Sequence, residues 1–337
     1  MNLNIIEKKI YQKKIIDVYC HKGSIIKSIK GLIKIYPQHS FKRKILLLIN
    51  ILNILILKIP CSLDLNFRKK YEFSINNNKS SIVLISYHKI FNQRAYIYFF
   101  DNKIKLESII KIGLDKIQIR KMEHEFKILK NLIKNNINFK IPKILNYINK
   151  NDIGLLHLEA IGDEYKIMSK EDPLPEEVFY SISNFNKNPK FLPLKSLRIN
   201  KNLYKNIVSK LFKDLLNEIS DRSMIRISSC HCDLGSDNVF RKDFPKSIRD
   251  YAIIDWEHYS EDAPYLSDKI SYFLGRYHAK IKSGDKQKIK ISTFELFRTF
   301  GSDKEQMTTV LITLLYLASK NLDLAKIILF SNYDNTR

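Results

Sequence analysis

Two polar patches in the second half of the sequence combine residue types that can accept a proton and hold a metal ion. The first patch is HCDLGSDN, from His231 to Asn238, and the second is IIDWE, in which Asp255 follows an apolar run. A carboxylate such as that of Asp233 can orient a hydroxyl group and take its proton. Mg²⁺ prefers oxygen ligands, which a carboxylate and an amide can supply. A loop followed by a β-hairpin would bring these groups together, so the spacing predicts a base beside a magnesium site.

The order of the two patches resembles that of a known family. H-x-D-x-x-x-x-N followed by I-I-D-W-E is similar to the aminoglycoside phosphotransferase and choline kinase-like family, which has the protein-kinase-like fold. Pro264 and Asp268 continue the likeness, because they follow as in the family's D-W-E…P…D stretch. The resemblance covers roughly residues 80–337 and is strongest over 228–275. It implies an enzyme that uses ATP and Mg²⁺ to phosphorylate a hydroxyl group.

The resemblance also implies a role for each polar residue of the patches. Asp233 would be the catalytic base, and Asn238 and Asp255 would bind magnesium. His231 would hold the loop in shape, whereas Glu257 would either assist metal or acceptor binding or cap the segment. Isolated residues of these types are usually turn or cap residues, which is the alternative for each of them. Phosphoryl transfer in such a site depends on positioning and charge neutralisation.

Upstream residues match the nucleotide site that the same fold requires. Lys111 lies in the apolar run IIKIG, where an unpaired ammonium group would be costly to bury. The fold needs such a lysine to reach the α- and β-phosphates, held by a helical glutamate; otherwise it would be a strand-end lysine exposed to water. Glu125 is the expected partner, because it has apolar neighbours and Glu123 points to another side of the helix. The segment EAIG looks like the hinge, where Glu159 and Ile161 would meet the adenine.

One departure from the family concerns the loop Lys89–Arg94, KIFNQR, which contains no glycine. Close wrapping of phosphates by the backbone normally favours glycine. A catalytically degenerate kinase-fold binding or scaffold protein is therefore an alternative, although the expected site residues are present. A protein kinase is a further alternative, against which the W-E after Asp255, in place of F-G, argues.

The elements that position these residues follow from local patterns. Short runs rich in β-branched and aromatic residues predict strands, and apolar residues at helical spacing predict helices. The predicted strands are 81–88, 95–100, a run ending at 109–113, and 153–158, with a turn at 92–94, and the predicted helices are 117–134, 203–219 and 307–329. Three consecutive strands with short connections imply an antiparallel meander.

The chain is therefore expected to be an α+β protein with the protein-kinase-like two-lobed fold. Its expected parts are a basic helical N-terminal extension over 1–75, a small antiparallel-sheet lobe over 76–160, and a larger, mainly helical lobe over 161–337. The last part would carry the catalytic loop and the metal site.

Composition limits the classes of partner. The 337 residues hold 58 Lys and Arg against 35 Asp and Glu, which gives a net charge of +23. The excess is spread along the chain without an aromatic-bearing nucleic-acid motif, so we expect no nucleic-acid partner. The four cysteines lack metal-ligand spacing and are too few for a disulfide scaffold, which favours a reducing, cytoplasmic setting.

Residues 1–75 carry a disproportionate share of the charge, with 15 Lys and Arg against 4 Asp and Glu. They also contain the uncharged apolar run Ile45–Leu57, which is shorter than the ~20 residues of a bilayer-spanning helix. Two interpretations remain for this run. It is either a helix buried in the fold or an amphipathic segment that lies on an anionic membrane surface, at the inner membrane face.

The acceptor is the least specified part of the reaction. Acids outnumber bases between Glu159 and Glu177, where only Lys166 and Lys170 oppose them. In the resembling family this segment borders the acceptor site, so a cationic acceptor such as an amino alcohol or amino sugar is one expectation. A solvated acidic loop is the alternative, and a membrane-attached enzyme would suit a lipid-linked sugar. We therefore expect a small-molecule or glycoconjugate acceptor.

Overall fold

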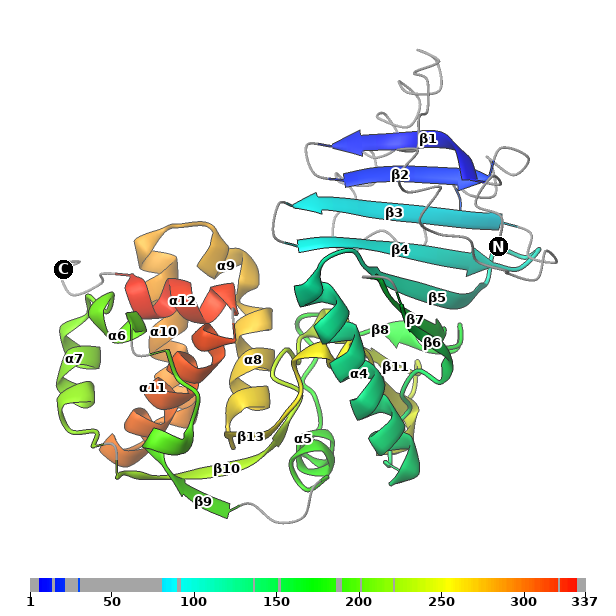
Figure 1. The fold of residues 1–337 in the computed structure, drawn as a ribbon. Coiled ribbons are helices and arrows are strands. Elements are labelled where there is room, and N and C mark those ends of the chain that lie inside the picture. Colours follow the sequence, from blue (N-terminus) through cyan, green and yellow to red (C-terminus); the bar gives the residue numbers. More distant parts are fainter. Residues whose placement is uncertain are drawn as a thin grey trace. The chain divides into compact units, whose positions relative to one another are not determined.

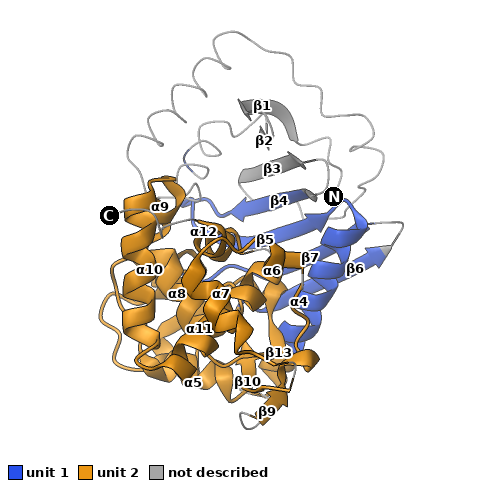
Figure 2. Cartoon of the chain, turned by 90° about the vertical axis from the view of Figure 1, so that its left-hand side faces the viewer, with its two compact units in different colours: residues 1–130, 142–163 blue, residues 131–141, 164–337 orange. Residues whose placement is uncertain are grey.

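The chain forms two compact units. The computed structural model describes residues 6–13, 16–21, 30, 81–89, 92–135, 137–150, 153–185, 190–200, 202–220, 222–320 and 322–331. Unit 1 comprises Met1–Lys130 and Pro142–Asp163, and unit 2 comprises Asn131–Ile141 and Glu164–Arg337 (Figure 2). The sequence predicts the boundary between the two lobes after residue 160. In the structure the chain passes from unit 1 into unit 2 for the last time after Asp163.

Unit 1 is built on an antiparallel sheet. In chain order its strands are β1 (Ile6–Lys13), β2 (Ile16–His21), β3 (Ser81–Lys89), β4 (Asn92–Phe100), β5 (Leu106–Gly113), β6 (Ile144–Lys150) and β7 (Ile153–Glu159). Neighbours in space follow the order β1-β2-β3-β4-β5-β7-β6 (Figure 1). Apolar side chains face each other across β4 and β5, Ile97 opposite Ile110 and Ala95 opposite Ile112, and all four are buried. The expected meander is confirmed by β3, β4 and β5.

The N-terminal segments differ from the prediction. Residues 6–13 and 16–21 are strands, so the helical extension expected over 1–75 is wrong for these two segments. Both segments contain β-branched and aromatic residues, which suit strands, and β2 pairs along β3 and satisfies its backbone groups there. The run Ile45–Leu57 lies outside the described residues.

Helix α4 (Lys116–Lys134) follows β5 and begins close against the sheet. Asp115 caps its first turn by accepting a hydrogen bond from the Gln118 N–H at 2.8 Å. A Cβ atom on Gly113 would lie 2.8 Å from the backbone nitrogen of Ile119, and one on Gly154 would lie 3.2 Å from the Ile119 Cα. The two glycines oppose each other on β5 and β7. Their missing side chains allow the close approach of α4 to the sheet.

Unit 2 is mainly helical. Its helices are α5 (Glu176–Ser183), α6 (Asn202–Lys205), α7 (Lys210–Asn217), α8 (Ser267–Arg276), α9 (His278–Lys282), α10 (Lys286–Phe300), α11 (Lys304–Ser319) and α12 (Asp323–Phe330). In α11 every side chain from Val310 to Ala318 is buried, which is typical of a helix surrounded by others. Residues of α7, α8, α10 and α12 complete the same core.

Two small sheets of unit 2 hold the polar patches. One has the order β13-β10-β9, from β13 (Ser260–Pro264), β10 (Met224–Cys230) and β9 (Lys190–Pro193). The other has the order β12-β11-β8, from β12 (Tyr251–Ile253), β11 (Val239–Arg241) and β8 (Lys166–Ile167). Strand β10 ends directly before His231. The β11–β12 hairpin starts after Asn238 and ends shortly before Asp255.

Three local predictions differ from the structure. Residues 92–94 belong to β4, because Asn92 lies opposite Lys89 in the β3–β4 register. The helix expected over 203–219 is divided into α6 and α7, and the one expected over 307–329 is divided into α11 and α12. Apolar spacing continues through both breaks because residues there, such as Ile207 and Leu322, pack on the same core as the helices.

Candidate active site

Lys111 and Glu125 form a buried ion pair in unit 1. The Lys111 Nζ lies 2.9 Å from the Glu125 Oε1 and 2.8 Å from the Oε2, and the two side chains are only 12% and 1% exposed. Strand β5 carries the lysine and helix α4 carries the glutamate. Glu123 pairs instead with Lys127 on the exposed side of α4. The structure therefore pairs Lys111 with Glu125 rather than Glu123 and holds its ammonium group in a defined place.

The segment predicted to be the hinge follows β7. Glu159 is the last residue of that strand, its N–H donates to the Lys143 carbonyl, and its carboxylate lies 3.5 Å from the Lys143 Nζ. The Ala160 N–H donates to the Glu107 carbonyl at 2.9 Å. Ile161 follows Ala160, whose N–H makes this hydrogen bond. The contacts of Glu159 and Ile161 with adenine stay a prediction.

His231 is fully buried at the start of the loop that carries Asp233. Its Nε2 lies 2.9 Å from the Ile254 carbonyl oxygen, which can only accept, so this nitrogen carries the proton. Its Nδ1 accepts a longer hydrogen bond, 3.4 Å, from the Asp233 N–H. The ring of Trp256 packs against it edge to face, with centroids 4.7 Å apart. His231 in this tautomer links the loop to the segment that bears Asp255.

Asp268, in the first turn of α8, is buried and accepts hydrogen bonds from the backbone of the same loop. Its Oδ2 accepts from the His231 N–H at 2.9 Å, and its Oδ1 accepts from the Cys232 N–H at 2.8 Å. Burial raises its pKa to about 7, although the two N–H donors act in the opposite direction. The sequence showed Asp268 only as part of a motif. Its role as the anchor of the loop depends on a contact that only the fold reveals.

Asn238 and Asp255 lie at the same end of the β11–β12 hairpin. Val239 lies opposite Ile253 in the register, and the Ile254 N–H donates to the Asn238 carbonyl at 3.0 Å. The side-chain Nδ2 of Asn238 donates to the Asp233 carbonyl at 2.9 Å. The amide nitrogen thus links the Asp233 backbone to the hairpin, and the amide oxygen is the atom that a cation would bind.

Two residues of the site have left-handed backbone conformations, Cys232 and Asp255, both with φ of 67°. Asp tolerates this region better than most residues, and such conformations cluster at functional sites. Next to Asp255, the indole of Trp256 is buried and donates to the Ile253 carbonyl at 3.2 Å. Glu257 lies 3.1 Å from His258, so it has a structural partner. The residue that follows Asp255 is thus fixed by burial and by a hydrogen bond.

Magnesium, which the sequence resemblance implies, fits this donor set. A carboxylate and an amide oxygen are hard ligands of the kind that Mg²⁺ binds, usually together with water and substrate phosphates. Over the described ranges no group of three or more His, Cys, Asp and Glu side chains could hold a metal ion by itself. A cation here would therefore depend on ligands from a nucleotide and water.

Four of the seven acids in the segment from Glu159 to Glu177 pair with cations of the protein. Its ion pairs are Glu159 with Lys143, Glu164 with Lys140, Asp172 with Arg241 and Glu176 with Lys269. Tyr272 also donates a hydrogen bond to the Asp172 carbonyl. These contacts favour a structural role for much of the segment over an open acidic surface.

The geometry of the site can be set beside known proteins. No protein-family model and no curated protein matches the chain. Among solved structures, APH(2'')-IIia with GDP and kanamycin is 11% identical with a TM-score of 0.39, over 75% of this chain and 86% of that one. ADP-bound aminoglycoside phosphotransferase APH(2'')-Ib is 11% identical with a TM-score of 0.32, over 79% and 98%.

An aminoglycoside-3'-phosphotransferase of type VIII is 12% identical with a TM-score of 0.34, over 64% of this chain and 87% of that one. The chain is similar to aminoglycoside phosphotransferases. The roles of single residues rest on the site itself.

Proposed function

We propose that the chain is an ATP-dependent phosphotransferase that phosphorylates a hydroxyl group of a small molecule or glycoconjugate. The observation that carries the proposal is the joint anchoring of the Asp233 loop. Asp268 holds its backbone, His231 links it to Ile254, and Asn238 binds the Asp233 carbonyl. Such preorganisation is what phosphoryl transfer requires of a protein.

Each site residue has one task in this proposal. Asp233 orients the acceptor hydroxyl and takes its proton. Asn238 and Asp255 hold Mg²⁺, which supplies charge neutralisation on the phosphates when bound. Lys111, fixed by Glu125, contacts the α- and β-phosphates. Their roles follow the motif, and the hydrogen bonds above support the arrangement.

The adenine would lie at Glu159 and Ile161, where a backbone segment follows a strand. The glycine-free loop Lys89–Arg94 is part of a hairpin whose strands are paired up to Lys89 and Asn92. A side chain on every residue of that loop limits how closely the backbone can approach phosphates. This observation favours a second candidate, a kinase-fold protein that binds a ligand without turnover.

The proposed acceptor class takes account of the charges of the segment 159–177. Because cations of the protein already pair with much of the segment 159–177, a cationic amino alcohol or amino sugar receives little support from it. A neutral hydroxyl of a glycoconjugate, including a lipid-linked sugar, fits at least as well. Mass spectrometry of a metabolite pool incubated with the chain, ATP and Mg²⁺ identifies the acceptor by its added phosphate.

The base assignment is tested with Asp233→Asn, and Asp237→Asn, an exposed neighbour in the same loop, is the matched control. We expect Asp233→Asn to abolish turnover, by a factor of about 10² or more, while nucleotide binding persists. Asp237→Asn should keep most activity. Near wild-type phosphorylation by Asp233→Asn would show that the base is another group, and absence of turnover in the wild type on every acceptor pool would favour the binding protein.

Residues 1–75 are proposed to touch an anionic membrane surface peripherally. Their excess of Lys and Arg supports this proposal. In the part of the chain that the structure describes, none of the helices is long and apolar enough to cross a membrane.

A further inference from the structure

The connection between β11 and β12 presents an unusually exposed aromatic side chain. Phe244 is 87% exposed, more than any other large apolar side chain in the described part of the chain. Lys246 and Arg249, in the same connection, are also exposed. Phe244, Lys246 and Arg249 are here called the hairpin tip.

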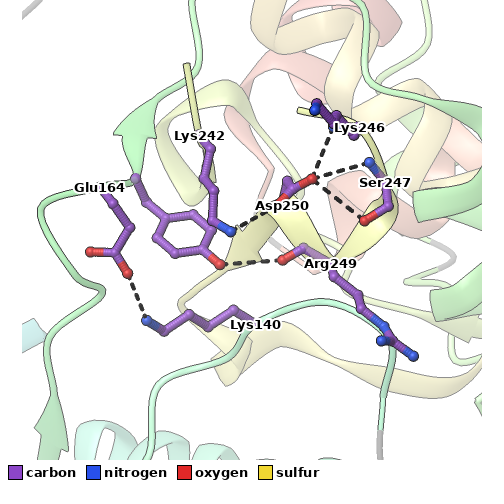
Figure 3. Close-up of polar contacts among 8 residues, drawn as sticks. Lys140, Glu164, Lys242, Lys246, Ser247, Arg249 and Asp250 are labelled. Atoms are coloured by element: carbon purple, nitrogen blue, oxygen red, sulfur yellow. Dashed lines mark hydrogen bonds and ion pairs between the residues drawn. The ribbon is translucent and has the colours of Figure 1, made fainter. Parts of the chain in front are cut away.

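The connection that carries the hairpin tip is held by several polar contacts around Asp250 (Figure 3). The Asp250 carboxylate binds the Lys242 Nζ at 2.8 Å, the Lys246 N–H at 2.9 Å and the Ser247 N–H at 3.1 Å. A capping box between Ser247 and Asp250 closes the short helical turn Ile248–Asp250. The hydrogen bond from Lys242 is the main reason that the pKa of Asp250 falls to about 2, so the acid stays ionised at any physiological pH.

Further contacts link the β11–β12 connection to the rest of unit 2. The Tyr165 hydroxyl donates to the Arg249 carbonyl at 3.2 Å, and the ammonium groups of Lys140 and Lys242 lie 4.8 and 5.6 Å from the Tyr165 ring centroid. Glu164 lies 3.5 Å from the Lys140 Nζ. Phe244 is therefore exposed on a connection with a fixed shape.

The β11–β12 connection has a net positive charge. Its two acids are each neutralised by a lysine, Asp243 by Lys166 at 2.7 Å and Asp250 by Lys242. The Arg249 side chain extends away from Asp250 (Figure 3). An exposed aromatic ring beside exposed cations is complementary to a surface that is apolar within and anionic outside.

We propose that the hairpin tip is a contact point for an anionic lipid membrane, into which Phe244 inserts while Lys246 and Arg249 meet lipid phosphates. A stable protein–protein interface buries about 800 Å² on each partner, far more than one turn offers. A fluid lipid surface requires no complementary shape, and the net charge of +23 favours approach to an anionic one. The contact is independent of phosphoryl transfer and of residues 1–75.

The single tryptophan of the chain makes the insertion directly measurable. Trp256 is buried, so the wild type has no exposed indole. In full-length Phe244→Trp, vesicles of phosphatidylserine and phosphatidylcholine should shift the emission to shorter wavelength, and brominated acyl chains should quench it. Vesicles of phosphatidylcholine alone should do neither. Tyr180→Trp is the matched control, because Tyr180 is 68% exposed beside Glu176 and Glu177 and should not respond.

A second measurement uses loss of binding. Phe244→Ser and Lys246→Ser/Arg249→Ser should each lower co-sedimentation with anionic vesicles several-fold at low salt, with unchanged thermal unfolding, since these side chains lie outside the core. Charge-neutral substitutions at Lys42, Arg43 and Lys44 in the full chain report separately on residues 1–75. An unresponsive indole in Phe244→Trp, or full vesicle binding by Phe244→Ser, would overturn the proposal. Failure of the wild type to bind anionic vesicles at low salt would also overturn it and leave the tip to a protein partner.

Discussion

At the scale of single residues, the Lys111–Glu125 pair is both a stability element and a candidate phosphate ligand. Neither charge has much access to water, so each depends on the other for compensation. Removal of the lysine alone leaves a buried carboxylate without its cation. The stability and the function of the pair can therefore be separated by substitution.

We predict that Lys111→Met lowers the free energy of unfolding by about 3–5 kcal/mol, and that Lys111→Met/Glu125→Leu recovers most of the loss. The double variant should still bind nucleotide more weakly than the wild type. Lys127→Met, which removes the exposed partner of Glu123, is the control and should change stability little. Urea titration of the four proteins measures the difference, and a Lys111→Met protein as stable as the wild type would contradict the prediction.

Asp268 is a second residue whose environment has a measurable consequence. Its pKa is about 7 in the folded protein, against 3.8 for an ordinary aspartate. Between these values the folded state holds a proton that the unfolded state releases. The contribution of Asp268 to stability is therefore full below about pH 4 and declines as the pH rises to about 7.

We predict that the free energy of unfolding falls between pH 4 and pH 7 through this group, by at most about 1.4 kcal/mol for each pH unit. Asp268→Asn should flatten that slope. It should also cost about 1–3 kcal/mol, because an amide nitrogen in place of a carboxyl oxygen cannot accept a hydrogen bond from the His231 or Cys232 N–H. Denaturation of wild type and variant at several pH values provides the test. Identical slopes would show that Asp268 does not titrate in this range.

At the scale of elements, the contact of α4 with the sheet depends on two glycines. Gly113 ends β5, two residues after Lys111, and a Cβ there would meet backbone atoms of Gln118 and Ile119 within 3.0 Å. Backbone atoms cannot move aside as a flexible side chain can. A methyl group would therefore push the start of α4 away from the strand that carries Lys111.

We predict that Gly113→Ala destabilises the protein by about 1–3 kcal/mol, as overpacking commonly does. It should also weaken nucleotide binding, because Glu125 on α4 positions Lys111. Gly275→Ala in α8 is the control, since its added methyl would meet only an ordinary contact at 3.7 Å. Thermal unfolding and nucleotide titration report the two effects. Equal tolerance of both substitutions would mean that α4 has room to shift.

At the scale of the whole molecule, bound nucleotide should connect stability to the proposed activity. A ligand that binds only the folded state stabilises it by an amount that grows with its concentration, about 2.7 kcal/mol at a hundredfold excess over Kd. In the proposed function, Asn238 and Asp255 supply oxygen ligands for Mg²⁺ and Lys111 binds phosphate. Both the metal and the nucleotide are therefore needed for full stabilisation.

We predict that millimolar Mg·ATP raises the unfolding temperature of the wild type and that ATP with a chelator raises it much less. Asp255→Ala should lose most of the effect, whereas Lys111→Ala should lose a smaller part, because the lysine is one cation among several. A thermal-shift titration compares the proteins. No stabilisation of the wild type at millimolar nucleotide would exclude the kinase function and favour the degenerate binding protein.

The local sequence pattern was sufficient to predict many of the strands and helices and to recognise the motif around Asp233. The strands around Ile97 and Ile110 and the helix around Phe126 were predictable because side-chain periodicity reflects which face is buried. Asn238 and Asp255 lie at the same end of a short hairpin, and hairpins bring chain neighbours together. The roles of these residues in catalysis remain predictions of the motif.

Contacts between distant parts of the chain could be seen only in the tertiary structure. The pairing of β2 with β3, the anchoring of His231 by Asp268, and the neutralisation of Asp172 by Arg241 each join segments without a shared local pattern. The breaks after α6 and α11 were hidden because residues there are apolar and pack on the same core. By itself the sequence determined the motif and the types of elements such as β4, β5 and α4, since these depend on near neighbours, but it predicted a helical segment where β1 and β2 are strands. Packing decided which charges are compensated and which segments join the sheet, because burial and ion pairing depend on proximity in space.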